Sequence, residues 1–85
     1  MKKEKNFKTS SFPLAVFLFT KNQRLVGISL SDDPAKKDFE FLLTDRLEDL
    51  VEKYKFGDRD DSDLFVEVHI YEQLRRDLLD RLNER

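Results

Sequence analysis

The chain of 85 residues has no cysteine, no tryptophan, one histidine, two glycines and two prolines. Without cysteine it can form no disulfide bond, thiolate nucleophile or cysteine-based zinc or iron–sulfur site. His69 has no second imidazole with which to build a histidine-based metal site. Gly27 and Gly57 lie too far apart to form a glycine-rich phosphate loop. We therefore expect no enzyme, and no metal, cofactor or small-molecule substrate.

The sequence also has no long apolar segment. Its longest apolar run, residues 12–19, has eight residues, against about 20 for a membrane-spanning helix. Lysines precede this run as in a signal peptide, but Lys21, Gln23 and Arg24 stand where a small-residue cleavage site is expected. We expect a cytoplasmic protein with no membrane anchor, in keeping with the lack of cysteine.

Charged residues are abundant but nearly balanced. They make up 40% of the chain, whose net charge is −2, and the 39% of apolar residues favours a folded chain over a disordered one. The first eight residues carry +3, which leaves −5 for the rest of the chain. The charged residues of this segment are Lys2, Lys3, Lys5, Lys8 and Glu4. We interpret residues 1–9 as a flexible basic arm and residues 10–85 as one domain.

A first helix is predicted at residues 12–21. The hydroxyl of Ser10 or Ser11 can cap its start, Pro13 fits its first turn, and Asn22 follows where a left-handed residue commonly ends a helix. The helix is apolar on nearly all sides, so part of it is expected to contact another protomer. The candidate interaction surface consists of Phe12, Val16, Phe17 and Phe19.

Two strands are predicted next, at residues 24–30 and 37–43, joined by a turn rich in aspartate and proline at 31–34. Gly27 predicts a bulge or a close approach of another backbone. Together these segments favour an antiparallel hairpin.

Phe39 and Phe41 lie on one face of the second strand, as stacking aromatic residues do on some RNA-binding sheets. Because Asp38 and Glu40 place negative charge beside them, we interpret the two phenylalanines as core residues that pack against helices.

A second helix is predicted from a cap at Thr44 or Asp45 to the residue before Gly57. A short third strand at residues 64–66, with a possible extension to residue 68, and a final helix from about residue 67 or 68 to 83 follow. The predicted apolar stripes of the two helices are Leu47, Leu50, Val51 and Tyr54, and Tyr71, Leu74, Leu78 and Leu82. The order helix, strand, strand, helix, short strand, helix predicts a small single α+β domain, with helices packed on one face of an antiparallel sheet.

The segment between the last two helices is acidic. Asp58, Asp60 and Ser62 have the spacing of the first three ligands of a calcium loop, but Asp63 and His69 stand where that loop needs glycine and glutamate. We interpret the segment as a solvated loop, which is mobile if the repulsion among its carboxylates is not compensated.

Several short motifs occur in order along the chain. They are Phe7-Lys8-Thr9, Leu14-Ala15-Val16-Phe17-Leu18, Phe39-Glu40-Phe41, Tyr54, and Arg76-Asp77-Leu78 followed by Asp80-Arg81. In these motifs the chain resembles a small family of bacterial and phage proteins of unknown function, with the patterns F-K-T, L-A-x-F-L, F-x-F and R-x-L-x-D-R. It departs from the family where Val68 replaces a proline. The resemblance implies an accessory or regulatory role and no catalytic residue.

We expect a non-catalytic protein-interaction module that self-associates, as a homodimer, or binds another protein, through the apolar first helix or an uncovered sheet edge. The alternative is a nucleic-acid-associated accessory or regulatory protein of a phage or mobile element. Its phosphate contacts would come from Lys2, Lys3, Lys5 and Lys8.

Overall fold

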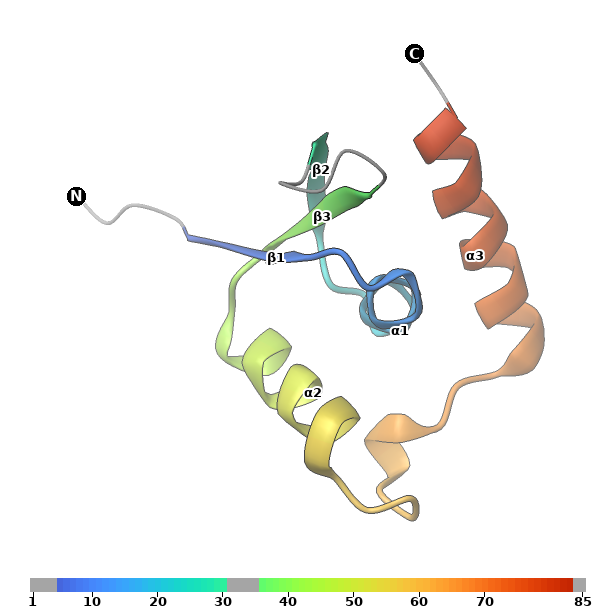
Figure 1. The fold of residues 1–85 in the computed structure, drawn as a ribbon. Coiled ribbons are helices and arrows are strands. Elements are labelled where there is room, and N and C mark those ends of the chain that lie inside the picture. The colour runs from blue at the N-terminus through green and yellow to red at the C-terminus, as the bar shows by residue number, and fades with distance from the viewer. Residues whose placement is uncertain (1–4, 31–35, 84–85) are drawn as a thin grey trace.

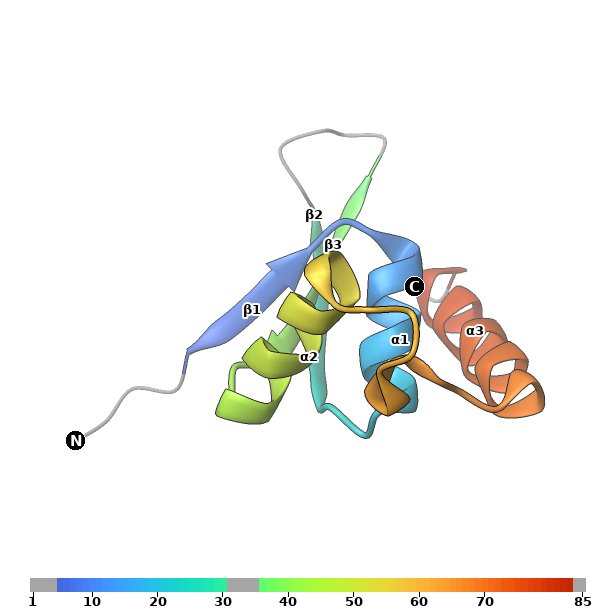
Figure 2. The same cartoon turned by 90° about the horizontal axis from the view of Figure 1, so that it is seen from below.

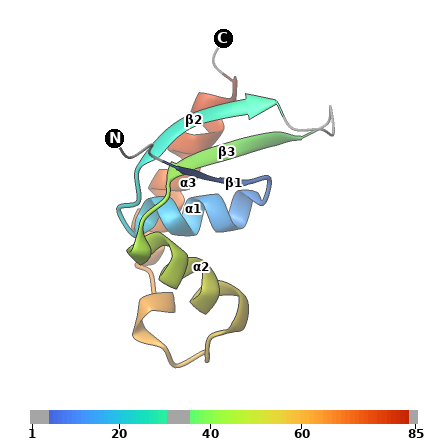
Figure 3. The same ribbon diagram turned by 90° about the vertical axis from the view of Figure 1, so that its left-hand side faces the viewer.

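Three strands and three α-helices make up the part of the chain that the computed structural model describes, residues 5–30 and 36–83 (Figure 1). In chain order the elements are β1 (Asn6–Thr9), α1 (Phe12–Thr20), β2 (Leu25–Leu30), β3 (Lys37–Leu42), α2 (Asp45–Phe56), the 3₁₀ turn η1 (Ser62–Leu64) and α3 (Val68–Asn83). The strands form one antiparallel sheet in the order β1-β3-β2, and the helices lie on one face of it (Figure 3). The predicted α+β class is confirmed.

Helix α1 begins and ends close to the residues that the sequence predicts. The Ser11 hydroxyl accepts a hydrogen bond from the Leu14 backbone N–H at 3.3 Å. Pro13 occupies the first turn, where its missing N–H has no helical partner to lose. Asn22 has a φ of 65°, the left-handed conformation that ends many helices. These local signals define the helix around which the other elements pack.

The core is centred on α1, which lies beneath the sheet and between α2 and α3 (Figure 2). Residues Leu14 to Leu18 are all buried. The other buried apolar side chains come from β3, α2 and α3 and are Phe39, Phe41, Leu47, Leu50 and Leu78. Phe39 and Phe41 therefore face the helices, which confirms their interpretation as core residues.

Strand β1 lies in the segment expected to be part of a flexible arm, and this expectation was wrong for residues 6–9. Phe7 pairs with Phe41 in the antiparallel register, and the Leu43 N–H donates to the Lys5 carbonyl at 2.9 Å. The side chain of Phe7 packs against the core. The strand forms because β3 offers it a ladder of hydrogen bonds, a partner remote in sequence that four residues of local pattern cannot reveal.

The third strand predicted at residues 64–66 was also wrong, because the segment instead follows η1. The Asp61 side chain accepts a hydrogen bond from the Asp63 N–H at 2.9 Å and so caps this turn. Leu64 and Val66 still pack against the core, so the apolar pattern reflects burial without strand pairing. The predicted hairpin turn at 31–34 lies outside the described residues.

The two glycines serve different purposes. The pairing of β2 with β3 shifts between Leu25 and Gly27, which confirms the predicted bulge. Gly57 follows α2, and a Cβ atom there would lie 2.6 Å from the Lys53 carbonyl oxygen.

Within residues 5–30 and 36–83, no helix has the length and apolar character needed to cross a membrane.

Candidate functional site

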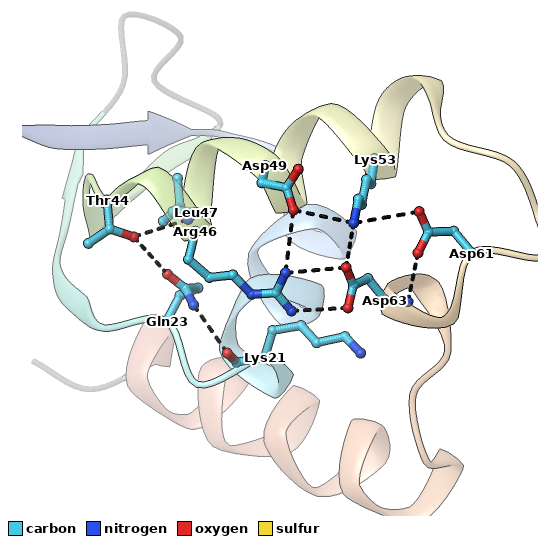
Figure 4. Close-up of polar contacts among 9 residues, drawn as sticks. All are labelled: Lys21, Gln23, Thr44, Arg46, Leu47, Asp49, Lys53, Asp61 and Asp63. Carbon is cyan, nitrogen blue, oxygen red and sulfur yellow. Dashed lines mark hydrogen bonds and ion pairs between the residues drawn. The ribbon is translucent and has the colours of Figure 1, made fainter.

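A cluster of charged side chains joins α2 to η1 (Figure 4). Arg46 makes a two-pronged contact with the Asp63 carboxylate at 3.1 and 3.2 Å. Lys53 lies on the same side of α2, and its ammonium is 2.6 Å from Asp63, 3.3 Å from Asp49 and 3.7 Å from Asp61. Two cations and three carboxylates thus hold η1 against α2, and we name these five residues the α2–η1 cluster.

The charges of this cluster support one another. Hydrogen bonds from Arg46 and Lys53 hold the pKa of Asp63 well below its usual value. The same hydrogen bonds to Asp63 raise the pKa of both Arg46 and Lys53. These shifts keep Arg46, Lys53 and Asp63 in their charged forms at neutral pH, so these three groups are not suited to exchange protons there. The ion pairs of the cluster therefore fix the segment around η1 to α2.

A second set of polar contacts fixes the entry to α2. The Thr44 hydroxyl accepts a hydrogen bond from the Leu47 N–H at 3.0 Å, as the sequence predicts for a helix cap. The same hydroxyl donates to the Gln23 side-chain oxygen at 3.3 Å. Lys21 donates through its ammonium to the Phe65 carbonyl at 2.7 Å. These contacts tie the α1–β2 connection to α2 and to the segment after η1.

The acidic segment does not form the calcium loop that its spacing resembles. Asp58 and Asp60 are exposed, whereas Asp61 and Asp63 contact Lys53, which compensates part of their repulsion. His69 is exposed, and its Nδ1 lies 2.9 Å from Glu67. Within the described residues, no group of three or more His, Cys, Asp or Glu side chains is placed to hold a metal ion.

Half of the interaction surface predicted on α1 is buried within the chain. Val16 is 0% exposed and Phe17 is 4% exposed. Phe12 and Phe19 are partly buried: the Phe12 ring lies 5.9 Å from that of Phe39, and the guanidinium of Arg81 lies over Phe19. The expectation of an exposed apolar side was wrong for Val16 and Phe17, because α2, α3 and the sheet enclose the helix.

The lysines predicted as a nucleic-acid arm are only partly described. Lys5 and Lys8 are exposed, and Lys2 and Lys3 lie outside the described residues. Lys8 pairs with Glu40 across β1 and β3, on the face of the sheet opposite the helices. The described lysines of the segment thus do not lie on a uniformly basic surface.

Two open grooves flank the helices. One lies between β1 and α2, has a volume of about 500 Å³ and includes Phe7, Val51 and Phe56. The other, of about 440 Å³, lies between Phe12 and Leu82. Apolar and charged side chains line both grooves together, and both are open to solvent.

The two edges of the sheet differ in charge and exposure. Strand β1 carries the exposed Lys8 on one edge. Strand β2 forms the other edge (Figure 3) and has no charged residue between Leu25 and Leu30. It exposes 44% of Val26 and 77% of Leu30. Within the described part of the chain, no strand pairs with its outer side. The outer edge of β2 is therefore the candidate site for contact with another chain.

The sequence contained a signal for this site, since residues 25–30 are uncharged and include a glycine. These features did not indicate that this strand lies at the edge of the sheet.

The chain matches no protein-family model, no curated protein sequence and no solved structure. The resemblance to a family of unknown function therefore stays a prediction.

Proposed function

We propose that this chain is a non-catalytic protein-interaction module that self-associates through the outer edge of β2. The observation that carries the proposal is an uncharged edge strand with two exposed aliphatic side chains, Val26 and Leu30. The unpaired N–H and C=O groups of an edge strand are a template for another chain, and proteins often protect such edges with lysine. Lys8 supplies that protection on β1, and β2 has no equivalent.

A second copy of the chain is the partner that best fits this edge. An uncharged strand can lie antiparallel to its own copy without placing like charges opposite each other. The same pairing through β1 would bring Lys8 of both copies to the interface. The interface would be isologous, so it closes after two copies and forms no open filament.

Light scattering at several protein concentrations tests this function. We expect the wild-type mass to rise toward that of a dimer with concentration, and Leu30→Lys to stay monomeric at those concentrations because each copy would place a charge at the pairing edge. Phe56→Lys is the matched control, because Phe56 is 82% exposed but lies in α2. A wild-type protein that is monomeric throughout would overturn the proposal. Loss of the dimer in Phe56→Lys alone would move the interface to the groove between β1 and α2.

The alternative function is binding of nucleic acid through the N-terminal lysines. It is supported by the exposure of Lys5 and Lys8, but Lys8 pairs with the acidic Glu40. Titration with single- and double-stranded nucleic acid at two salt concentrations separates the two functions. Phosphate binding weakens steeply with salt because counterions are released, whereas pairing through uncharged strands does not. Binding only at low salt would favour the alternative, and its absence at low salt would remove it.

A further inference from the structure

The regular part of β2 turns defined backbone groups toward solvent. The Leu42 N–H donates to the Arg24 carbonyl at 2.9 Å, so the backbone groups of Leu42 point toward β2. Backbone directions alternate along an antiparallel strand, and Glu40 and Asp38 therefore point toward β2 as well.

These directions identify the free groups of β2. Gly27 and Ser29 lie opposite Glu40 and Asp38, and so use their N–H and C=O groups within the sheet. The residues between and after them, Ile28 and Leu30, turn their N–H and C=O groups outward. A second strand can therefore form its hydrogen bonds to these two residues without disturbing β3.

The side chains of β2 divide between the two faces of the sheet. Ile28 lies opposite Phe39. Because the helices cover Phe39, which is 2% exposed, Ile28 is on the helix-covered face. Gly27 and Ser29 are on the open face, where they are the smallest side chains of the strand. The regular part of the strand thus carries an aliphatic side chain on the helix-covered face and small side chains on the open face.

We infer that two copies pair β2 against β2 in antiparallel register centred on Ile28, which forms one continuous six-stranded sheet. This inference rests on the proposed function and specifies its partner and geometry. In this register Gly27 of each copy lies opposite Ser29 of the other, and Val26 lies opposite Leu30. Small residues therefore meet small residues on the open face of the joined sheet.

Neighbouring registers are less complementary. A centre at Gly27 sets the exposed Leu30 of one copy against Arg24 of the other. A centre at Ser29 leaves Val26 with no β2 residue opposite it. The bulge before Gly27 bends the strand and limits regular pairing to its second half. The centre at Ile28 places this regular segment in the middle of the interface.

The charged side chain of Arg81 borders the pairing edge. Arg81 of α3 lines a groove of about 220 Å³ with residues 25–28 of β2. Its guanidinium lies 5.3 Å from the centre of the Phe19 ring, a cation–π contact within its own chain. Arg81 is thereby held beside the first half of the strand.

Disulfide trapping tests the register, because a chain without cysteine carries only the thiols introduced into it. In the register centred on Ile28, residues 27 and 29 of the two copies form a pair with Cα atoms about 4.5 Å apart, within the range of a disulfide. Residues 27 and 27, or 29 and 29, would lie about 8 Å apart, beyond that range. An added Cβ at Gly27 meets no heavy atom within 4 Å, and serine and cysteine are close in size.

The experiment mixes equal amounts of Gly27→Cys and Ser29→Cys, oxidises them and identifies the products by mass. We expect the 27–29 disulfide well above the half that random pairing gives. Gly27→Cys mixed with Ser10→Cys is the control and should give no excess of the mixed product. Each variant is also examined by light scattering under reducing conditions to confirm that it associates like the wild type.

The possible results separate the register from the function. Dimers by light scattering that yield mainly 27–27 or 29–29 disulfides would overturn the register and keep the β2 edge. Dimers that form no disulfide at either position would overturn the register and place self-association at another surface. Monomers at all concentrations would overturn both the register and the proposed function.

Discussion

Among the helices and strands that the structure describes, α1 and β2 are the two without a charged residue, and they differ in how they are packed. Helix α1 buries Leu14 to Leu18 beneath the sheet and between two helices. Strand β2 contributes Ile28 to the core's margin but exposes Val26 and Leu30. The more apolar segment is therefore the less available to a partner. A high apolar content indicates that a segment is buried against another element. Its position in the topology decides whether that element belongs to the same chain.

The largest expected effect comes from replacing a buried leucine of α1 by alanine. Leu18 is 0% exposed, so Leu18→Ala removes buried methyl groups and leaves a cavity. We expect the free energy of unfolding to fall by about 2–5 kcal/mol, measured by urea denaturation at low protein concentration. A loss below about 0.5 kcal/mol would contradict the central position of α1.

The next effect concerns the α2–η1 cluster, which holds η1, and with it Leu64, against the rest of the fold. The pKa of Asp63 is lowered from its ordinary value of 3.8 by hydrogen bonds from Arg46 and Lys53. A carboxylate with a lowered pKa stabilises the fold above that ordinary value, and the stabilisation is lost as the pH falls below it. The urea midpoint of the wild type should therefore drop between pH 6 and pH 3, and that of Asp63→Asn should drop less.

Asp60→Asn is the control for this pH dependence, because Asp60 is an exposed member of the same acidic segment. It should follow the wild type at both pH values. An equal drop in Asp63→Asn and wild type would show that the cluster does not contribute to folding. High salt should reduce the difference, since the side chains of the cluster are partly exposed to solvent.

A smaller effect, of opposite sign, is expected at Gly27 in β2. The position has no positive φ, and an added Cβ meets no heavy atom within 4 Å. Gly27→Ala should raise the free energy of unfolding by about 0.4–1 kcal/mol, because alanine restricts the unfolded chain. Gly57→Ala is the contrasting variant and should destabilise, because its Cβ would lie 2.6 Å from the Lys53 carbonyl oxygen. Destabilisation by Gly27→Ala in thermal unfolding would show that this stretch of β2 is more tightly packed.

The smallest effect on folding is expected from Leu30→Ala, the counterpart of Leu18→Ala. Leu30 is 77% exposed, so its truncation should change the free energy of unfolding of the monomer by less than about 0.5 kcal/mol. Dimer formation should weaken nevertheless, as sedimentation at several concentrations can measure. Equal destabilisation by the two leucine substitutions would remove the distinction between α1 and β2.

The success of the sequence-based predictions followed how local their signals are. Ser11, Pro13 and Asn22 set the limits of α1 through contacts within a few residues. The alternation of Phe39 and Phe41 correctly indicated which face of β3 is buried. Strand β1 was missed because its four residues become a strand only by pairing with the remote strand β3, where Phe7 lies opposite Phe41. Residues 64–66 were wrongly predicted as a strand because burial alternates along them although they form no hydrogen bonds with another strand.

The candidate site was predicted only in outline. An uncovered sheet edge was expected, but the specific residues were placed on α1, where Val16 and Phe17 are buried. The edge could not be identified without the strand order β1-β3-β2. Once β1 occupies one side of β3, β2 is left at the opposite edge with its outer side open.

The amino-acid sequence by itself determined the limits of the helices, the inward face of β3, the bulge at Gly27 and the lack of cysteine chemistry, because each depends on a residue and its close neighbours. The tertiary structure decided that residues 6–9 form a strand, that α1 is enclosed and that β2 is an uncharged edge. Solvent exposure depends on which elements pack together, and packing joins residues that are distant along the chain. That is why the most apolar segment became the core and a less apolar strand became the candidate interface.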